Sequence, residues 1–306
     1  MKILLTGGTG FFGRELLRSF LVEGYLVILS CRQPKLIVNT PLGESLCDIC
    51  GIAPNELSRI FKKHPDIIAV VHGATDYGRS ASLPTQVFSG NLEFPIRLLE
   101  EAMVSNIPIF LNIDTFFSIN KNNYQHLGEY ALSKRHFQEW GELCAMHRKI
   151  RFINFRLFHL YGPSDNPKKF VSEIIRDCLR NSEINLTHGL QRRDFIFLKD
   201  ASIALNCVLK AESMNSAGYV NYDVGSGESY TIREFVETIK RLTGSSSKLN
   251  FGVLPSRSGE FLDACADLRG LRAIGWSPST LLEDGLLLTI NEQLSFNNKV
   301  FSNDEP

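Results

Sequence analysis

The sequence has no excess of charge of either sign. Its 306 residues include 33 Lys and Arg against 33 Asp and Glu, so the formal net charge is zero. Binding nucleic acid through a global basic field needs a positive balance, and we therefore expect no nucleic-acid partner. An anionic ligand would have to be met by local cations.

Long hydrophobic runs are also missing. A membrane-spanning helix needs about 20 apolar residues, and the longest late run, Leu281 to Ile290, is interrupted by Glu283, Asp284 and Gly285. The apolar run at the N-terminus is too short for a signal peptide. We expect no membrane partner and a cytoplasmic protein.

Cysteine is sparse and odd in number. Seven Cys are scattered over the chain, which favours a reducing cytoplasm over a disulfide framework. Cys47 and Cys50 form a close pair, but no second pair follows at zinc-finger spacing. We predict no metal site, and whether this pair has any role stays open.

The sequence does contain a regular alternation of strand-like and helical segments. Short apolar runs alternate with stretches of helical period, such as 13–21 and 91–103, which is typical of a parallel sheet wrapped by helices. We predict an α/β fold: a Rossmann-type doubly wound parallel sheet with a smaller mixed α/β lobe. The expected strands are Lys2–Leu5, Leu26–Ser30, Ile67–His72, Ile109–Ile113, Arg151–Phe155 and Tyr219–Val224.

The pattern of expected secondary structure changes after Gly162-Pro163, where the elements become shorter and the loops longer. A further strand-like stretch then ends in Gly225-Ser-Gly227. We expect the chain to leave the main sheet and return to it. The predicted first domain spans 1–165 and 197–227, and the predicted smaller lobe spans 166–196 and 228–306.

The first expected strand runs into a glycine-rich turn, Thr6-Gly-Gly-Thr-Gly-Phe-Phe-Gly13. The glycine spacing alone is weak evidence, but here it follows a strand and opens an amphipathic helix. In that setting glycines allow a tight turn and the close approach of a pyrophosphate, which the helix N-terminus attracts. The alternative is that they only make a strand-to-helix turn. We predict a dinucleotide site that includes Gly7, Gly10, Phe11, Phe12 and Gly13.

The end of the second expected strand indicates which dinucleotide binds. An NAD site usually has an Asp or Glu there for the ribose 2′-hydroxyl, whereas this chain has Ser30-Cys31-Arg32. No acid repels a 2′-phosphate and a guanidinium can bind it, so NADPH or NADP is favoured over NAD. The alternative is a solvated surface Arg32. Asp48, near the next short strand, is a weaker candidate for an adenine contact.

A second motif, Tyr130-Ala-Leu-Ser-Lys134, places a phenol and an ammonium group on one face if the segment is helical. The pKa of an unperturbed Tyr is about 10, so proton exchange near neutrality needs a neighbouring positive charge. Lys134 can supply it. Thr115 brings a hydroxyl to the carboxyl edge of the sheet, where ligands bind.

With these motifs and several others, the chain resembles the extended short-chain dehydrogenase/reductase family, the NAD(P)-dependent epimerases, dehydratases and reductases of nucleotide sugars. The likeness covers nearly the whole length, and several matches in the right order are more specific than any one. The matching pieces are Thr6–Gly13, Val71–Ala74, Asn91, Tyr130 with Lys134, Arg156–Pro163, Arg193–Phe195 and Asp223–Gly227.

The resemblance implies a role for each matching residue. Thr115 corresponds to the hydroxyl that hydrogen-bonds the substrate oxygen, Tyr130 to the general acid/base, and Lys134 to the residue that holds the nicotinamide ribose and lowers the pKa of the Tyr. Ala74 and Asn91 fall at cofactor-binding positions. His159 departs from the family's usual Asn, and each single Arg or Lys has a solvated charge as its alternative. The implied sugar-nucleotide contacts are Asp114, Thr115, His159, Lys168, Phe170, Arg193 and Arg257.

Phe116 and Phe117 narrow the expected reaction. The family's dehydratases carry an Asp-Glu pair immediately after the catalytic Thr, and two aromatic side chains cannot move protons. A 4-epimerase keeps its NAD bound, whereas a net reductase exchanges its cofactor, usually NADPH, so Arg32 favours a reductase. This region is most similar to the CDP-abequose and CDP-paratose synthases, which reduce the 4-ketone of CDP-4-keto-3,6-dideoxyglucose during bacterial O-antigen synthesis.

The expected protein is therefore an oxidoreductase, an NADP-dependent nucleotide-sugar 4-ketoreductase, and the resemblance suggests a homodimer. Two alternatives stay open. One is an NAD-dependent 4-epimerase of another nucleotide sugar. The other is a non-catalytic NADP(H)-binding redox sensor, against which the intact Thr115, Tyr130 and Lys134 argue. The base of the nucleotide and the stereochemistry at C4 also stay open.

Overall fold

The structure is a computed structural model that describes residues 1–301 apart from 79–82, 120–126, 148–149, 214–215 and 258. The chain divides into two compact units, each described by itself. Unit 1 comprises residues 1–157, 202–223 and 269–276, and unit 2 comprises 158–201, 224–268 and 277–306. The domain boundaries drawn from the sequence stay a prediction.

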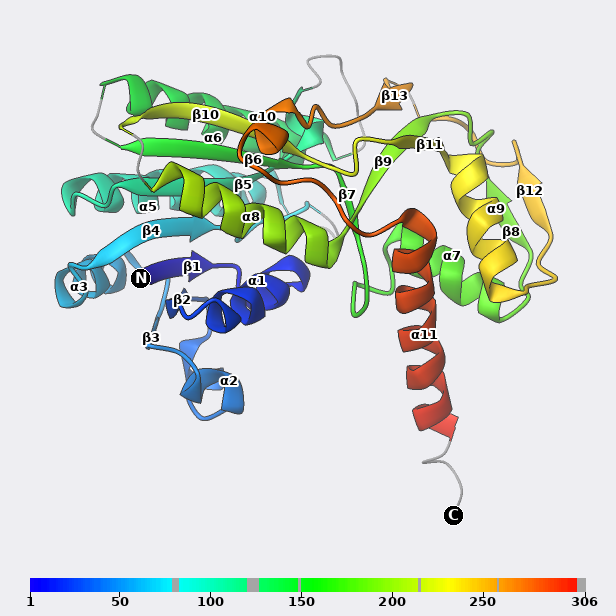
Figure 1. Cartoon of the computed structure of the whole chain (residues 1–306), viewed down its shortest axis with the longest axis horizontal. Coiled ribbons are helices and arrows are strands. Elements are labelled where there is room, and N and C mark those ends of the chain that lie inside the picture. Colours follow the sequence, from blue (N-terminus) through cyan, green and yellow to red (C-terminus); the bar gives the residue numbers. More distant parts are fainter. Residues whose placement is uncertain (79–82, 120–126, 148–149, 214–215, 258, 302–306) are drawn as a thin grey trace. The chain divides into compact units, whose positions relative to one another are not determined.

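Unit 1 is built on a seven-stranded sheet of order β10-β6-β5-β4-β1-β2-β3 (Figure 1). The pairs from β6 to β3 run parallel. Since β1 lies between β2 and β4, the chain reverses its direction of travel across the sheet there, as in a doubly wound fold. This confirms the predicted Rossmann-type sheet. The strands are β1 (Lys2–Thr6), β2 (Leu26–Ser30), β3 (Asp48–Cys50), β4 (Ile67–His72), β5 (Ile109–Thr115), β6 (Arg151–Leu157) and β10 (Gly218–Val224).

Helices cover both faces of this sheet (Figure 1). On one face α1 (Phe11–Val22) and α8 (Leu198–Glu212) lie together, joined by a hydrogen bond from Asn206 Nδ2 to Ser19 Oγ at 2.6 Å. On the other face α3 (Pro54–Lys63), α5 (Phe94–Val104) and α6 (Gly128–His147) bury an apolar core against β1, β2, β4, β5 and β6. The shorter segments of the unit are η1 (Pro34–Leu36), α2 (Pro41–Glu44), α4 (Pro84–Phe88), η2 (Ser89–Glu93), η3 (Phe116–Ile119) and α10 (Arg269–Ala273).

The two strands under α6 change character along their length. β5 and β6 pair in register, and on the face toward α6 the pairs are Phe110 with Phe152, then Asn112 with Asn154, then Asp114 with Arg156. Successive inward-facing residues of a strand are two apart, so aromatic, amide and charged side chains follow one another toward the carboxyl edge. β10 continues the three rows with Tyr219, Asn221 and Asp223.

Unit 2 contains two small sheets and three long helices. β9 (Arg192–Phe197) pairs in parallel with β7 (His159–Tyr161) and β13 (Asp263–Ala264), and antiparallel with β11 (Ser229–Thr231). β8 (Ile184–Leu186) pairs with β12 (Leu249–Phe251). α7 (Phe170–Leu179), α9 (Ile232–Thr243) and α11 (Leu282–Phe301) enclose the core, where Phe195 and Phe235 stack with ring centroids 3.7 Å apart.

Gly141 on α6 tests the packing of the helix on the sheet. A Cβ there would lie 2.1 Å from Cζ of Phe152, and that ring is held by Phe110, Phe137 and Tyr219. We expect Gly141→Ala to lower the free energy of unfolding by about 1–3 kcal/mol, because overpacking forces the ring out of place. Urea unfolding measures the change.

The control is Gly128→Ala in the same helix, where a new Cβ meets no described heavy atom within 4 Å. It should leave the free energy of unfolding unchanged or slightly higher, since Ala is a better helix former. Equal effects of the two substitutions would contradict the close contact.

Candidate active site

The glycine turn at the carboxyl end of β1 has no room for side chains. Gly7 has φ +74°, and a Cβ on it would lie 2.5 Å from the Ala74 nitrogen in the loop after β4. A Cβ on Gly13 would lie 2.0 Å from the Gly7 oxygen. The turn closes with a 3.0 Å hydrogen bond from Gly10 N to Gly7 O. Phe11 and Phe12 then begin α1, whose N-terminus offers amide groups and a partial positive charge to an anion.

Thr6 and His72 hold the loop after β4 against this turn. Thr6 Oγ1 accepts hydrogen bonds from the amides of Gly73 and Ala74, both at 3.2 Å, and lies 2.8 Å from His72 Nδ1. Burial of His72 disfavours its imidazolium form, and Lys134 repels it, so its pKa lies well below the usual value. A neutral, packed His72 at the strand end therefore fixes the backbone near Gly7.

Asn91 connects that loop to α6. It lies in η2, a π-helical turn, and is 2 % exposed. Its Oδ1 accepts from the Asp76 amide at 2.7 Å, and its Nδ2 donates to Asp76 O at 2.7 Å and to Ser133 Oγ at 3.1 Å. Binding of the cofactor by Asn91 stays a prediction. These bonds show that it fixes the loop that carries Ala74 relative to the helix of Tyr130 and Lys134.

Arg32 and Asp48 have different surroundings. Arg32 is exposed just after β2, where the Ser30 hydroxyl donates to Gly51 O at 3.1 Å. Asp48 begins β3, and Lys63 and His64 donate to its carboxylate at 2.6 and 2.9 Å. Burial alone would raise the pKa of Asp48, but these bonds outweigh it and lower the pKa to about 2. Because Lys63 and His64 precede β4, Asp48 is engaged at the starts of the strands, away from the glycine turn.

Unit 1 buries the three predicted catalytic residues, Thr115, Tyr130 and Lys134. Thr115 ends β5, two residues beyond the predicted strand end, and Phe117 N approaches its Oγ1 at 3.4 Å. Tyr130 and Lys134 lie one turn apart on α6 and are 6 % and 2 % exposed. The ring of Tyr77 lies 5.0 Å from that of Tyr130, centroid to centroid. Tyr77 belongs to none of the sequence motifs, and its contact with Tyr130 is found only in the structure.

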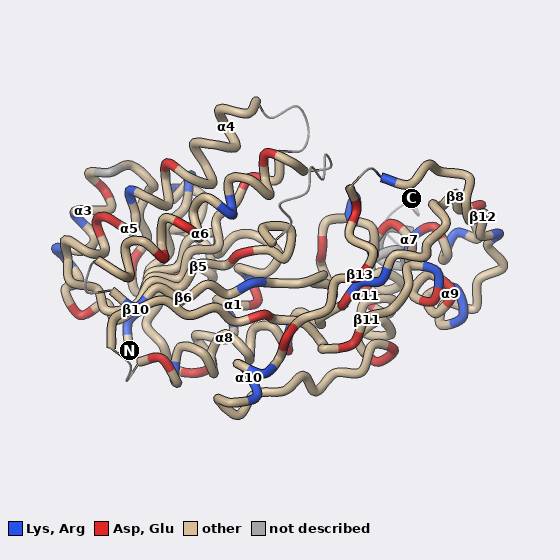
Figure 2. The backbone as a smooth tube through the Cα atoms, turned by 90° about the horizontal axis from the view of Figure 1, so that it is seen from above, with Lys and Arg blue, Asp and Glu red and all other residues tan. Residues whose placement is uncertain are grey.

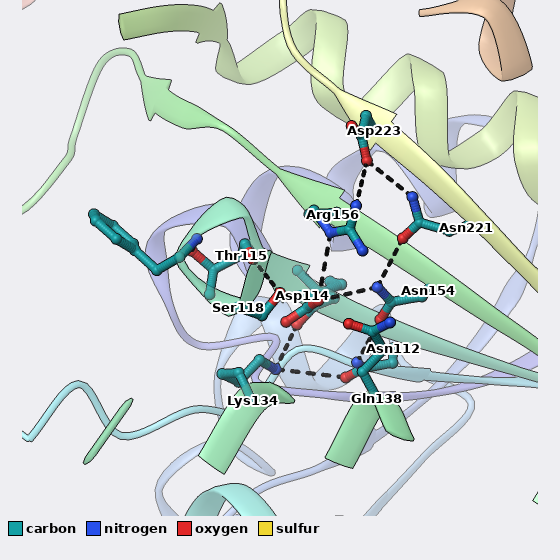
Figure 3. A network of polar contacts seen from close by, with 12 residues as sticks. Asn112, Asp114, Thr115, Ser118, Lys134, Gln138, Asn154, Arg156, Asn221 and Asp223 are labelled. Atoms are coloured by element: carbon teal, nitrogen blue, oxygen red, sulfur yellow. Dashed lines mark hydrogen bonds and ion pairs between the residues drawn. The ribbon is translucent and has the colours of Figure 1, made fainter. Parts of the chain in front are cut away.

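Lys134 reaches down onto β5. Its Nζ donates to Ile113 O at 2.6 Å and to Asn112 Oδ1 at 3.4 Å (Figure 3). Burial lowers the pKa of Lys134 to about 8, although Asp114 acts in the opposite direction. The side chain is therefore an ammonium at neutral pH.

Asp114 belongs to a buried polar network on the same sheet face (Figure 3). Its Oδ2 accepts hydrogen bonds from Ser118 Oγ at 2.8 Å and Asn154 Nδ2 at 3.0 Å, and Arg156 Nε lies 3.9 Å away. Arg156 also donates to Asp223 at 2.9 Å. The carboxylate of Asp114 is therefore held inside unit 1, and its contact with substrate stays a prediction.

Unit 2 carries the other five predicted contacts. Arg193, on β9 and 3 % exposed, donates to Glu260 Oε1 at 2.7 Å and to Phe261 O at 2.8 Å. Burial, together with Arg193, lowers the pKa of His159 on β7 to about 3, so its imidazole is neutral. Phe170 begins α7, and its ring stacks on that of Phe235 with the ring centroids 6.3 Å apart. Lys168 and Arg257 are exposed in loops.

Lys and Arg are not separated from Asp and Glu in either unit. Basic and acidic positions are interspersed along the backbone of each unit (Figure 2). Over the described residues, no three His, Cys, Asp or Glu side chains come together in a way that could hold a metal ion.

Burial raises the pKa of the Cys50 thiol to about 11. In the part of the chain that the structure describes, no helix is long and apolar enough to cross a bilayer.

The glycine turn, the seven-stranded sheet and the Tyr130 and Lys134 pair define a class. The chain belongs to the NAD-dependent epimerase/dehydratase family, whose sequence pattern matches residues 3–225. This confirms the family that the motifs indicated.

Particular relatives extend the likeness. A CDP-abequose synthase from Salmonella muenchen is 35 % identical over 286 residues, covering 93 % of this chain and 95 % of that protein. One from Salmonella typhimurium is 32 % identical over 291 residues, with the same two coverages. Among solved structures, the UDP-glucuronic acid 4-epimerase from Bacillus cereus in complex with UDP-glucuronic acid and NAD has a TM-score of 0.83 at 22 % identity, covering 97 % of this chain and all of that one.

Proposed function

We propose that this protein is an NADPH-dependent 4-ketoreductase of a nucleotide-linked deoxysugar. The proposed substrate is CDP-4-keto-3,6-dideoxyglucose, and the product is CDP-abequose or CDP-paratose for bacterial O-antigen, a part of lipopolysaccharide. The observation that carries the proposal is the set Thr115, Tyr130 and Lys134, in which Thr115 is followed by Phe116 and Phe117 and not by acids. Two relatives named CDP-abequose synthase, each covering 93 % of the chain, support the same reaction.

The residues of unit 1 fit a dinucleotide and favour NADPH. The glycine turn is a cradle that a Cβ at Gly7 or Gly13 would fill, which leaves backbone amides to face a pyrophosphate. At the end of β2, Ser30 and the exposed Arg32 stand where an NAD site carries an acid. When bound, NADPH supplies the hydride that adds to the keto carbon.

Thr115 and Tyr130 act on the keto oxygen in this proposal. The Phe117 amide approaches Thr115 Oγ1 as a donor, so the hydroxyl proton of Thr115 can point to another acceptor, the substrate carbonyl. As the carbon gains a hydride, the oxygen gains negative charge, and Tyr130 gives it a proton. Lys134 is charged below its pKa of about 8, and its charge favours the phenolate that Tyr130 becomes.

Unit 2 supplies the proposed sugar-nucleotide site. The cations proposed to bind the diphosphate are Arg193, Arg257 and Lys168. Arg193 would bind it while Glu260 fixes the guanidinium group of this arginine. Phe170 offers an apolar ring, and neutral His159 offers an uncharged hydrogen-bonding group in place of the family's Asn. For Asp114 the burial of the carboxylate favours a different role, argued in the next subsection.

A second candidate is an NAD-dependent 4-epimerase. The observation that favours it is the structural likeness to the Bacillus cereus 4-epimerase bound to NAD. An epimerase would return its hydride to the sugar and consume no added cofactor, so the two candidates differ in stoichiometry.

We expect the purified protein to oxidise NADPH stoichiometrically with CDP-4-keto-3,6-dideoxyglucose, and more slowly with the dTDP-, GDP- and UDP-linked 4-keto-deoxysugars. Absorbance at the NADPH band follows the reaction, and NMR identifies the product at C4. Tyr130→Phe should lower turnover by about 100-fold or more, because general acid catalysis is lost, and leave NADPH affinity nearly intact. Interconversion of two sugars without added cofactor would instead establish the epimerase.

Arg32→Ala tests the cofactor preference. We expect the Kd for NADPH to rise about tenfold or more, because a charge-assisted hydrogen bond to phosphate is lost, while the Kd for NADH stays the same. Quenching of protein fluorescence measures both constants. Lys35→Ala, at a neighbouring exposed cation, is the control for general electrostatic attraction. An unchanged NADPH to NADH ratio in Arg32→Ala would remove Arg32 from the site.

The seven cysteines support a cytoplasmic location. All of them are free thiols, and such a set persists in a reducing compartment.

A homodimer is the proposed assembly, and unit 1 offers a surface for it. The face of α6 opposite the sheet carries Leu132, Leu143 and Met146, which are 43, 46 and 66 % exposed, with Trp140 beside them at 45 %. These positions form one stripe at helical spacing. The exposed His136 and Glu139 also lie on this face, between Leu132 and Leu143. Exposed apolar side chains that gather on one helix face in this way are typical of a contact surface between subunits.

Light scattering should therefore give about twice the 34.4 kDa chain mass. The double substitution Leu143→Glu with Met146→Glu should give a monomer, since it buries charge in the interface. Val22→Glu, at an 82 % exposed apolar residue of α1, is the control and should stay dimeric. A dimeric double variant would show that α6 is not the interface.

A further inference from the structure

A buried row of polar side chains crosses the sheet of unit 1 beneath α6. In register it contains Thr6 of β1, His72 of β4, Asn112 of β5 and Asn154 of β6. The Asn112 amide donates to Asn154 at 2.9 Å, and Asn154 is in turn linked to Asn221 of β10 at 2.9 Å. Five strands therefore share one polar line, and Lys134 contacts its centre at Asn112.

The charges beside this row do not balance among the strands alone. Arg156 is the cation between two carboxylates, 2.9 Å from Asp223 and 3.9 Å from Asp114. One negative charge is left over in a region where the side chain of Asp114 is fully buried. An uncompensated buried charge is strongly unfavourable. α6 supplies a further cation here, because Lys134 Nζ donates to Ile113 O, the residue before Asp114, at 2.6 Å. The charge of Asp114 favours the ammonium form of this lysine.

The hydrogen bonds of Asp114 are arranged to one side. Ser118 and Asn154 both donate to Oδ2. Within the described part of the chain, Oδ1 is buried without a hydrogen-bond partner. The fixed oxygen and the unbonded one leave the carboxylate in a defined orientation on the sheet face under α6, and an opposite charge nearby favours the charged form of a cation.

We propose that Asp114 is a positioning residue of the reaction that acts through Lys134. Its carboxylate is fixed by Ser118, Asn154 and Arg156 (Figure 3), and it keeps Lys134, one helical turn from Tyr130, in its charged form. The inference rests on the proposed function, since it acts through Lys134. It replaces the substrate contact that the sequence suggested for Asp114 by an action through a second residue.

The other groups around Lys134 act against its charge or through Asp114. His72 of β4 is neutral, and burial of Lys134 disfavours the ammonium. Tyr130, on the same helix, favours the ammonium only once it is ionised. Arg156 lies beyond Asp114, and Asp223 of β10 lies beyond Arg156. Among the described residues, Asp114 is thus the acid whose charge acts on Lys134.

The test is the titration of Lys134 in cofactor-free protein. Lysines labelled with ¹³C at Cε are followed by NMR against pH, and Lys134→Met assigns the resonance. The wild-type midpoint should lie near 8. In Asp114→Asn it should fall by about 1 unit or more, because an opposite charge is removed. At pH 8 the charged fraction of Lys134 then falls from about one half to about one tenth. The pH above which turnover declines should fall by the same amount as the midpoint.

Glu212→Gln is the matched control. Glu212 is also a buried carboxylate, bound at 2.7 Å to an arginine of β6, but that arginine is Arg151 at the start of the strand. The variant should lose stability and leave the Lys134 midpoint in place. A purely structural role for Asp114 predicts the same outcome for Asp114→Asn, and an unshifted midpoint there would overturn the proposal.

A charge-neutral double variant covers the case in which Asp114→Asn does not fold. Asp114→Asn with Lys134→Met removes both charges and leaves Arg156 paired with Asp223. Its melting temperature should exceed the value expected from adding the two single effects, since coupled residues are not additive. Additive effects, or a double variant less stable than either single one, would contradict the pairing. Neither readout needs substrate, so a failure of the proposed reaction would not be mistaken for a failure of this pairing.

Discussion

The structure depends on one contact, the meeting of the Lys134 ammonium with the polar row of the central sheet. A parallel sheet covered on both faces is usually apolar throughout, yet here amide and charged side chains lie under α6 at its centre. Their hydrogen bonds join β5, β6 and β10, while Arg156 is a single cation beside the two carboxylates of Asp114 and Asp223. The helix completes this arrangement, because the cation that it contributes is the one that the strands lack.

The order of the rows along the strands explains how stability and chemistry share one helix. Near the starts of the strands Phe110 and Phe152 stack 5.6 Å apart and pack on Phe137 of α6. Two residues further along come the amides, and then the charged pair Asp114 and Arg156. The aromatic end fixes α6 tightly enough to hold Lys134 and Tyr130 at the carboxyl edge. A change at Gly141 would therefore be felt at both ends of the helix.

Much of the fold and part of the site follow from local sequence patterns. The strands of the main sheet, the glycine turn and the Tyr130 to Lys134 spacing depend on neighbouring residues, and their periodicity can be read directly. The strand ends of β5 and β6 extend two residues past the predicted ones, because polar residues there pair with one another across strands. That pairing joins residues about 40 positions apart, which a local pattern does not contain.

The same limit explains the site residues whose surroundings the sequence did not predict. Asn91 matches a family position, but only the π-helical turn shows that its amide is used by Asp76 and Ser133. Arg193 is adjacent to a recognisable Asp, yet its partner Glu260 lies 67 residues away. Tyr77 lies in no motif, and its contact with Tyr130 depends on the loop that Asn91 holds through Asp76.

A comparison of two buried aspartates shows why Asp114 is more than a structural anchor. In unit 2, Asp194 Oδ1 accepts from the amide and hydroxyl of Ser226, and Oδ2 accepts from the amides of Gly227 and Ala266. Both oxygens are thus used to fasten loops. Asp114 is also buried, but Ser118 and Asn154 both donate to its Oδ2, and within the described residues Oδ1 has no hydrogen-bond partner. Asp194 therefore anchors loops with both oxygens, whereas the one-sided hydrogen bonding of Asp114 supports the role proposed for it on Lys134.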